Sequence, residues 1–356
     1  TVTVSPVSQR PSFMLSLAVF WQTKGRLSQA EMRLFTKHII EYYRPFMHTR
    51  IRILTRTLLG IAIMCLCPGT YGEAWNEMSG GKPHMENEIA DHVQYTETDS
   101  LKVASLLSEA RRQSDKTNIT IFFARKLIGL PYVTHTLEVN KREKLVVNLR
   151  QLDCTTYVEN VVALTMCVKQ NRYSFAAFCD NLRTIRYRGG SAPHYVRRLH
   201  YFTDWIQDNT AKGICREIQS PNPPFSATQK IKVYYMSTYP EKYEMLRNNP
   251  EHVKPISATE NAINGKSFRY IPKAAIKNTT LLRNTIKDGD IIALTTTLKG
   301  LDIQHVGFAV WHKDGLHLLN ASSLRHKVVE EPQTLYAYLQ KQRTMTGVRV
   351  VRFSAM

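Results

Sequence analysis

The amino-acid sequence predicts an α+β fold in which helices pack on a largely antiparallel β-sheet. Apolar residues recur every three or four positions between about 97 and 129, and again after position 154, as they do in amphipathic helices. Towards the C-terminus the period changes to two and β-branched residues become frequent. Because the helical segments come first and the strands follow, an alternating α/β fold is disfavoured. The predicted strands are residues 291–297, 306–311, 316–321 and 348–353.

The composition is that of a globular protein with a basic surface. Of the 356 residues, 43% are hydrophobic and 22% are charged, and the formal net charge is +19. The sequence has no long run of like charges and no basic stretch with regularly spaced aromatic residues, which argues against a nucleic-acid partner. The positive charge suits an anionic cell-wall polymer or a membrane surface, and a merely solvated basic surface is the simpler alternative.

Residues 47–74 have the pattern of a signal peptide. Three arginines precede the apolar run from Leu58 to Leu66, which is too short to span a bilayer. The small residues Gly72 and Ala74 suit a cleavage site, whereas a short buried helix is the alternative interpretation. We therefore expect an exported protein without stable membrane insertion, located in the periplasm of a Gram-negative bacterium.

The remaining sequence divides into an extension and one domain. Residues 1–46 show no clear pattern and are interpreted as a possible upstream extension that is not native to the protein. Residues 75–356 are predicted to form a single domain. Its parts are a helical region at 97–215, a loop-rich insert at 216–288 with several Pro and Asn breaks, and a sheet at 289–356.

Four cysteines fall within the predicted domain: Cys154, Cys167, Cys179 and Cys215. Disulfides form readily in exported proteins, but Cys167 and Cys179 lie in apolar helical stretches where a buried free thiol is ordinary. The sequence therefore leaves the disulfide state open. It contains no CxxC, no HExxH and no tight His/Cys cluster, so neither a metal nor another cofactor is expected.

Cys154 is the best candidate for a catalytic nucleophile. It stands where a short apolar run, 145–149, gives way to a helical pattern that Thr155 or Thr156 could cap. The positive end of a helix would lower the pKa of a thiol at this place, and its free backbone N–H groups could hold an oxyanion. A structural cysteine near a helix start is the alternative.

A nucleophilic cysteine needs a base, and His305 is the best candidate. If residues 312–315 form a hairpin turn, His305 lies opposite Ser322, and Asn320 lies diagonally across on the same face. Asn320 could then hold the orientation and tautomer of the imidazole. The same register turns His317 to the other face, although a slip of one residue would reverse this assignment.

Several motifs, in the expected order, resemble one family. NLRQLDCTTYVENVVAL and the downstream GDIIALTTTLKGLDIQHVGFAVWHKDGLHLLNASS look like the N-acetylmuramoyl-L-alanine amidase-like branch of the NlpC-type papain-like cysteine hydrolases, and GLPYVTHTLE, RRLHYFTDWIQDN and MSTYPEKY fit its pattern. The resemblance covers most of 97–353. It implies a papain-like core whose nucleophile helix packs on an antiparallel sheet, here with an added N-terminal helical region. It assigns Cys154 as nucleophile, His305 as base and position 320 as the third polar residue.

The sequence departs from this family pattern at two positions. Position 320 is often His in the family and is Asn320 here, an amide that serves the same role in papain-like enzymes, so activity is expected but with an altered pH dependence. Tyr239 stands in MSTYP where His is expected, which puts a ligand contact there in doubt.

The resemblance implies that the substrate is the amide between N-acetylmuramic acid and L-alanine in muropeptides, including anhydro forms. Asp153 either binds substrate or caps the helix. Tyr201 and Trp205 could present an aromatic surface to a sugar, but at helical spacing they could equally pack in the core. The predicted substrate-binding residues are Asp153, Arg198, His200, Tyr201, Asp204, Trp205, Gln304 and Ser322.

Two other functions fit the same residues. An NlpC-type endopeptidase would cut between D-glutamate and a diamino acid of the stem peptide. A catalytically inactive cell-wall-binding module would carry an unreactive Cys154.

Overall fold

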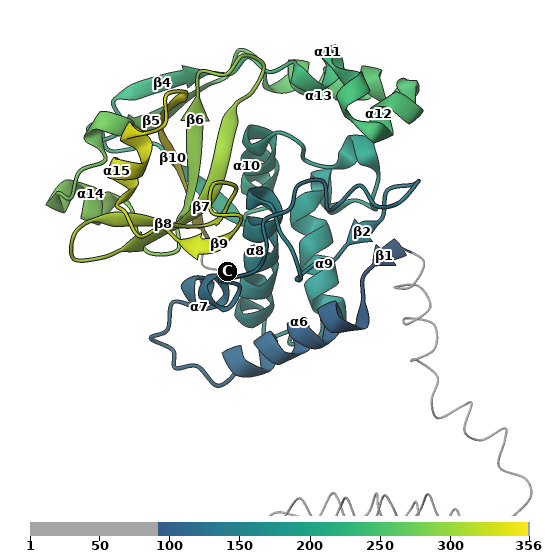
Figure 1. The fold of residues 1–356 in the computed structure, drawn as a ribbon, viewed down its shortest axis with the longest axis horizontal. Coiled ribbons are helices and arrows are strands. Elements are labelled where there is room, and N and C mark those ends of the chain that lie inside the picture. Colours follow the sequence, from purple (N-terminus) through teal and green to yellow (C-terminus); the bar gives the residue numbers. More distant parts are fainter. Residues whose placement is uncertain (1–91, 355–356) are drawn as a thin grey trace, which may run out of the picture. The chain divides into compact units, whose positions relative to one another are not determined.

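The computed structural model describes residues 92–354, shown in Figure 1. The predicted signal peptide at 47–74 and the extension at 1–46 lie outside this range. Within it, no helix is both long and apolar enough to cross a membrane.

The centre of the described chain is an eight-stranded sheet in which all neighbouring strands are antiparallel. The strand order is β4-β5-β10-β6-β7-β8-β9, with β3 paired to β10. The strands are β3 (Cys215–Ile218), β4 (Ala227–Lys230), β5 (Ser267–Pro272), β6 (Ile291–Thr296), β7 (Ile303–Trp311), β8 (Leu316–Ser322), β9 (Lys327–Glu330) and β10 (Met345–Phe353). The α+β prediction is confirmed, and the four predicted strands correspond to β6, β7, β8 and β10.

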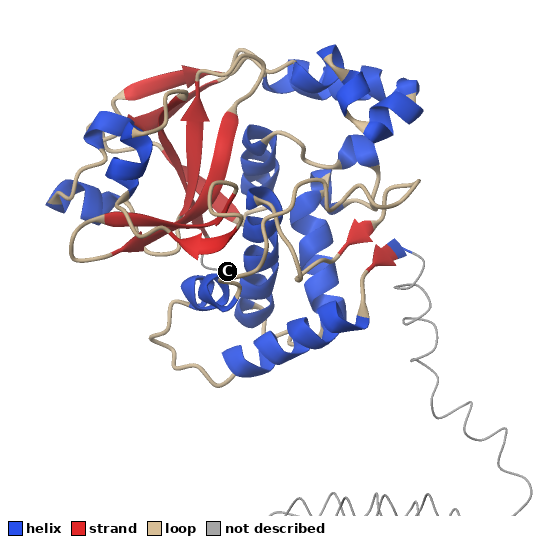
Figure 2. Ribbon diagram, in the orientation of Figure 1, coloured by secondary structure: helices blue, strands red, loops and turns tan. Residues whose placement is uncertain are grey.

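Helices cover both faces of this sheet (Figure 2). The helical pattern at 97–129 forms two helices rather than one, because Asn118 caps a new helix after the break at 111–118. The helices are α6 (Glu97–Ala110), α7 (Ile119–Lys126), α8 (Cys154–Lys169), α9 (Phe175–Arg186), α10 (Phe202–Ala211), α11 (Tyr235–Thr238), α12 (Glu244–Asn248), α13 (Val253–Ile263), α14 (Thr280–Thr285) and α15 (Leu335–Gln340).

Alternation along the strands separates two cores. Ala293, Phe308 and Leu319 pack with α6 to α9 on one face, and Leu294 and Leu318 pack with α14 and α15 on the other. A third, smaller core lies around α11 and α13. The sequences of β6 to β8 are apolar at almost every position, and not only at alternate ones, because both faces of these strands are covered.

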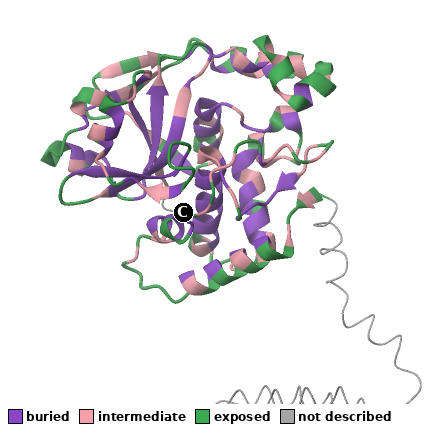
Figure 3. Ribbon diagram, in the orientation of Figure 1, coloured by how far each residue is buried: buried purple, intermediate pink, exposed green. Residues whose placement is uncertain are grey.

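Helix α8 is the central helix of the molecule. Every residue from Thr156 to Cys167 is buried, and the helix packs against β7, β8, α7 and α9 (Figure 3). A helix that is enclosed on all sides can carry apolar residues all round, which explains the run VVALTMCV. By contrast, α6 keeps an exposed outer face.

Two segments differ from the sequence interpretation. The run at 145–149 contributes only β2 (Leu145–Val146), which pairs in parallel with β1 (Val93–Gln94) outside the main sheet. The segment 216–288, expected to be loop-rich, supplies β3 and β5 to the sheet through pairing with β10, so the sheet begins well before residue 289. The β3 pairing joins residues more than 130 positions apart and the β5 pairing residues about 75 apart, and local patterning does not reveal such contacts.

The cysteines of the described chain are all free thiols. Cys167, Cys179 and Cys215 are buried in the large core beside α8, and Cys154 is partly buried. The ordinary packing role expected for Cys167 and Cys179 agrees with this placement.

A buried ion pair ties α8 to α9, and its removal should destabilise the fold. Arg186 Nε donates to Glu159 Oε2 at 2.7 Å, and both side chains are almost fully enclosed. Arg186→Met leaves a buried carboxylate unpaired, so we expect a loss of about 3–5 kcal/mol in the free energy of unfolding measured with urea. Arg172→Met, which breaks the exposed pair with Asp180, is the matched control and should cost less than about 1 kcal/mol. Equal losses in the two variants would contradict this account.

Candidate active site

Cys154 is the first residue of α8, and Asp153 determines where that helix begins. The Thr156 backbone N–H donates to Asp153 Oδ1 at 2.7 Å, and the Asp153 N–H donates to Thr156 Oγ1 at 2.9 Å. This reciprocal pair is a capping box, and it satisfies two backbone donors at the helix start. The cap is therefore Asp153 rather than Thr155 or Thr156 alone. Of the two roles considered for Asp153, the structure shows the capping role.

The β7–β8 hairpin has the predicted register. Trp311 pairs with Leu316 and Val310 with His317, so His317 points to the face opposite His305. His317 Nδ1 donates to the Glu331 backbone oxygen at 2.8 Å, which gives this histidine a structural partner away from His305.

His305 and Asn320 form a buried hydrogen bond. His305 Nε2 lies 2.8 Å from Asn320 Oδ1. The Asn320 amide is oriented by its Nδ2 group, which donates to the backbone oxygens of Leu318 and Val329, both at 3.4 Å. Because Oδ1 can only accept, this orientation assigns the imidazole proton to Nε2. Nδ1 is then left with a free lone pair that can accept a proton.

The thiol of Cys154 lies at the same end of β7. Its sulfur is within hydrogen-bonding reach of the backbone of Val306, the residue after His305. Helix α8 packs on the strand face that carries Phe308, where Tyr157 meets the Phe308 ring edge-on at 5.7 Å between centroids, whereas His305 pairs with Leu294 and belongs to the other face of β7. The charge of Asp153 raises the pKa of both Cys154 and His305, so this carboxylate lies within electrostatic reach of each group.

Two backbone features position His305. The pairing of β7 with β6 shifts register between Leu294 and Thr295, so Gln304 is an extra residue immediately before His305. A Cβ atom on Gly307 would lie 2.8 Å from both Asn320 Cβ and the Leu319 backbone oxygen. Only glycine lets β8 approach closely enough for the His305–Asn320 bond. Sequence reasoning missed Gly307, although a glycine inside a strand is itself a signal of close approach.

Burial sets the protonation states of the two groups. Burial, followed by the charge of Asp153, raises the pKa of Cys154 to about 12, and hydrogen bonds from Val306 and Thr155 only partly offset this. Burial lowers the pKa of His305 below its ordinary value of 6.5, against the opposing effects of Asn320, Glu331 and Asp153. The groups at the helix start do lower the thiol pKa, as expected, but burial outweighs them, so the net shift in the free protein is upward. At neutral pH the pair is a neutral thiol and a neutral imidazole.

Three predicted substrate-binding residues are buried in structural roles. Tyr201 donates from its hydroxyl to Glu260 at 2.6 Å. Trp205 has no exposed surface and stacks on Phe202 at 5.1 Å, so the prediction of an aromatic surface for a sugar is wrong for this residue. Asp204 is buried and accepts both donors of Arg188 at 3.0 and 2.6 Å. For Tyr201 and Trp205 the core alternative holds, and Asp204 pairs with Arg188 instead of facing a ligand, because burial depends on distant segments that pack over these positions.

Three other predicted substrate-binding residues, Arg198, His200 and Gln304, also bind partners within the protein. Arg198 is buried between Glu138 at 3.1 Å and Glu143 at 3.5 Å. The His200 ring bonds the Tyr195 backbone oxygen at 2.8 Å, and burial lowers its pKa to about 3. Gln304 is half-buried beside His305 and accepts hydrogen bonds from Thr296 and Thr344, both at 2.8 Å. These two hydrogen bonds hold the Gln304 side chain against β6 and the start of β10.

Ser322 reaches a residue that sequence reasoning missed. Its hydroxyl donates to Glu331 Oε1 at 3.1 Å, and both side chains are buried. Burial raises the pKa of Tyr132 and Tyr338. The charge of Cys154 adds to this rise at Tyr132 and, after that of Glu331, at Tyr338, so both phenols lie within electrostatic reach of the thiol. The motif GLPY carries Tyr132, but no local signal marks Tyr338 or Glu331.

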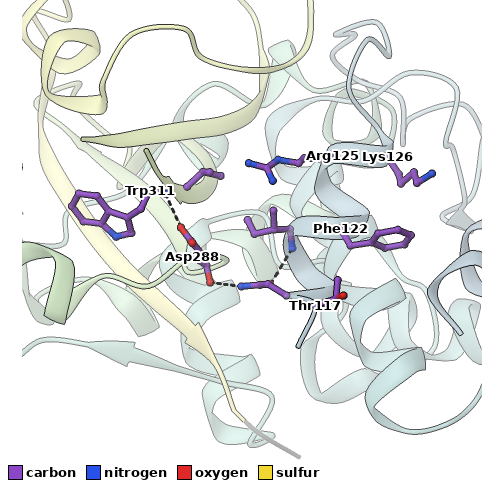
Figure 4. Close-up of a pocket in the computed structure, with 9 residues that line it drawn as sticks. Thr117, Phe122, Arg125, Lys126, Asp288 and Trp311 are labelled. Carbon is purple, nitrogen blue, oxygen red and sulfur yellow. Dashed lines mark hydrogen bonds between the residues drawn. The ribbon is translucent and has the colours of Figure 1, made fainter. Parts of the chain in front are cut away.

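A separate open pocket of about 600 Å³ lies between α7 and the far end of β7 (Figure 4). It is bounded by Trp311 and Asp288, and Val310 stands five residues, or roughly 17 Å, along the strand from His305. Its two cations already have acidic partners, Glu330 for Arg125 and Glu109 for Lys126. Between residues 92 and 354, no three acidic, His or Cys side chains are arranged to hold a metal ion.

The comparison with protein families agrees with this arrangement. The model of the AmiA-like family, described as N-acetylmuramoyl-L-alanine amidase-like, matches residues 122–346, more than half of the chain. The chain belongs to this family. The described geometry of Cys154, His305 and Asn320 lies within the matched range.

Solved structures give the same assignment of fold. An N-acetylmuramoyl-L-alanine amidase from Bacteroides uniformis is 38% identical, with a TM-score of 0.62, over 66% of this chain and 97% of that one. A candidate xylanase from Bacteroides fragilis is 39% identical, with a TM-score of 0.60, over 65% of this chain and 99% of that one. A Legionella pneumophila protein at 20% identity and a TM-score of 0.58, over 72% and 95%, supports the fold alone. No curated protein matches the chain.

Gly307→Ala should disrupt the site without touching a polar group. The new methyl group would clash with Asn320 Cβ and the β8 backbone, so the hairpin must move. We expect a loss of about 1–3 kcal/mol in unfolding free energy. Urea denaturation measures this loss, and unchanged stability would show that the close approach is not required.

Proposed function

We propose that the protein is a cysteine amidase that hydrolyses the N-acetylmuramoyl-L-alanine bond of peptidoglycan fragments, anhydro forms included. The observation that carries the proposal is the buried His305–Asn320 hydrogen bond, together with a thiol at the first residue of α8 that interacts with the backbone of Val306, the neighbour of His305. Membership of the amidase-like family and the named amidase at 38% identity support the choice of bond. The basic character of the chain suits an anionic muropeptide.

Acylation begins with a neutral pair. His305 Nδ1 takes the proton of Cys154 as the sulfur attacks the lactyl carbonyl carbon, a C–S bond forms, and negative charge develops on the carbonyl oxygen. Backbone N–H groups at the start of α8 stabilise that oxyanion. Because both groups start neutral, the proton moves during the attack rather than before it. The Asn320 oxygen stabilises the imidazolium through Nε2.

The second half of the reaction returns the enzyme to its starting state. The C–N bond breaks as the imidazolium donates its proton to the leaving nitrogen of L-alanine, which leaves a thioester on Cys154. His305 then accepts a proton from water, the hydroxide attacks the thioester carbonyl, and the C–S bond breaks. The muramic acid departs with a free lactyl carboxyl group, and Cys154 regains its proton from His305.

We also propose that the protein acts after export, in the periplasm of a Gram-negative bacterium. The arginine-rich, apolar and small-residue pattern of 47–74 supports this location. N-terminal sequencing of the protein recovered from the periplasm tests it. A chain that retains residues 47–74 in the cytoplasm would contradict it.

The products of one defined muropeptide decide which bond is cut. Mass spectrometry should find the free muramyl sugar and the intact stem peptide. Cleavage between D-glutamate and the diamino acid would instead identify an endopeptidase. Tight binding with no product would identify an inactive wall-binding module.

Substitution of the two reacting groups should abolish turnover. Cys154→Ser and His305→Ala each remove a group that takes part in bond making, so we expect kcat/KM to fall by at least about 10³-fold. Cys179→Ala, which alters a buried thiol elsewhere in the core, and His312→Ala, at the exposed hairpin turn, are the matched controls. Retained activity in Cys154→Ser would refute the mechanism.

The pH dependence should follow the two shifted groups. His305 must be neutral to act as base, and burial lowers its pKa, so the acid limb of kcat/KM should lie below 6.5. Cys154 must keep its proton until His305 takes it, and its pKa is raised to about 12, so activity should persist above the ordinary thiol value of 9.0. Kinetics across the pH range in which the fold persists measure both limbs. An acid limb above 6.5 would show that a different group controls the reaction.

A further inference from the structure

Glu331 is a buried carboxylate with no part in the mechanism above. It follows β9, is 2% exposed, and its backbone N–H donates to Leu318 at 2.9 Å. Buried carboxylates are costly unless they are paired and hydrogen-bonded. Its two oxygens meet Ser322 Oγ at 3.1 Å and Arg325 Nε at 3.5 Å.

The hairpin register relates this carboxylate to His305 through Ser322. The paired residues end at Phe308 and Leu319; the same register, extended by three residues, brings Ser322 opposite His305 and onto its face. Ser322 therefore separates the two groups, with its hydroxyl bound to Glu331 and its strand position beside the imidazole. The same hydroxyl accepts the backbone N–H of Arg325 at 3.3 Å, so the turn after β8 is tied to this point.

We propose that Glu331 is a positioning residue of the active site: through Ser322 it holds the strand opposite His305, and its buried negative charge stabilises the imidazolium that forms when His305 takes the Cys154 proton. The inference rests on the proposed function for its catalytic meaning. It adds to the thiol, imidazole and amide a fourth group that acts without touching the substrate.

The charges around His305 support this role. Charged or titratable groups approach from several elements, and among them Glu331 and Asp153 are the two whose negative charge raises the pKa of His305 against the effect of burial. Asp153 is held in place by the helix cap. Its negative charge also raises the pKa of Cys154 and therefore disfavours the thiolate. Glu331 supports the imidazolium from the far side of Ser322. The surrounding groups are Asp153 at the cap of α8, Cys154 on α8, Tyr132 before it, Asn320 and Ser322 on β8, Arg325 in the following turn, Glu331 after β9 and Tyr338 on α15.

The test removes the charge while keeping the shape. Glu331→Gln keeps an oxygen for Ser322 but carries no charge, so the pKa of His305 should fall further. The acid limb of kcat/KM should then move to lower pH by about one unit, and kcat should fall by up to about tenfold. Glu330→Gln is the matched control, because its carboxylate pairs with Arg125 and His312 instead. It should leave the acid limb where it is.

A second measurement does not depend on the substrate. Alkylation of Cys154 by iodoacetamide follows the fraction of thiolate–imidazolium pairs, which a lower His305 pKa reduces. Glu331→Gln should therefore slow alkylation at neutral pH by about tenfold. If the wild-type protein cuts no muropeptide but alkylation still slows, the proposed function fails and the electrostatic role of Glu331 stands.

A purely structural Glu331 predicts a different result. In that case Glu331→Gln should lower the unfolding free energy but leave the acid limb and the alkylation rate of the folded protein at their wild-type values. This result would overturn the proposal. If Glu331→Gln does not fold, Ser322→Ala replaces it. That variant keeps the charge but frees the carboxylate, so it should shift the acid limb in the same direction by less. An unchanged limb in folded Ser322→Ala would likewise overturn the proposal.

Discussion

The burial of α8 on every side is the constraint on which the rest of the structure depends. Because each residue from Thr156 to Cys167 is enclosed, the helix can neither slide nor rotate without opening the core. Its first residue is therefore held in place, and the Asp153–Thr156 capping box defines where that residue begins the helix. A thiol in such a position is oriented by the whole core rather than by local contacts.

The β7–β8 hairpin supplies His305 and Asn320 to the site, and the polar groups that it buries have hydrogen-bond partners. Asn320 is fully buried and would be costly without partners, but its amide meets His305 on one side and strand carbonyls on the other. Gly307 makes room for it, and Ser322 carries the next polar contact to Glu331. Polar residues thus occupy one end of an otherwise apolar hairpin face, and each has a defined partner.

The same burial has an electrostatic consequence. A dry site strengthens the hydrogen bonds and charges that act on the transition state, but it also disfavours both ionic forms of the resting pair. The raised pKa of Cys154 and the lowered pKa of His305 are two results of one cause. Asn320, and Glu331 as we propose, would restore part of the stabilisation that the imidazolium loses on leaving water. The site thus favours a proton that moves with the attack over a preformed ion pair.

The sequence by itself determined the α+β class, the strands β6 to β8, the hairpin register and the choice of His305 over His317, because alternation and turn residues are local properties. Cys154 was identified in the same way, from its place at the start of a helical pattern. Only the tertiary structure decided that Trp205 packs in the core, that Asp153 caps α8, and that burial raises the thiol pKa. Each of these depends on which distant segments exclude water from a side chain, and that exclusion is a property of the assembled core rather than of any stretch of sequence.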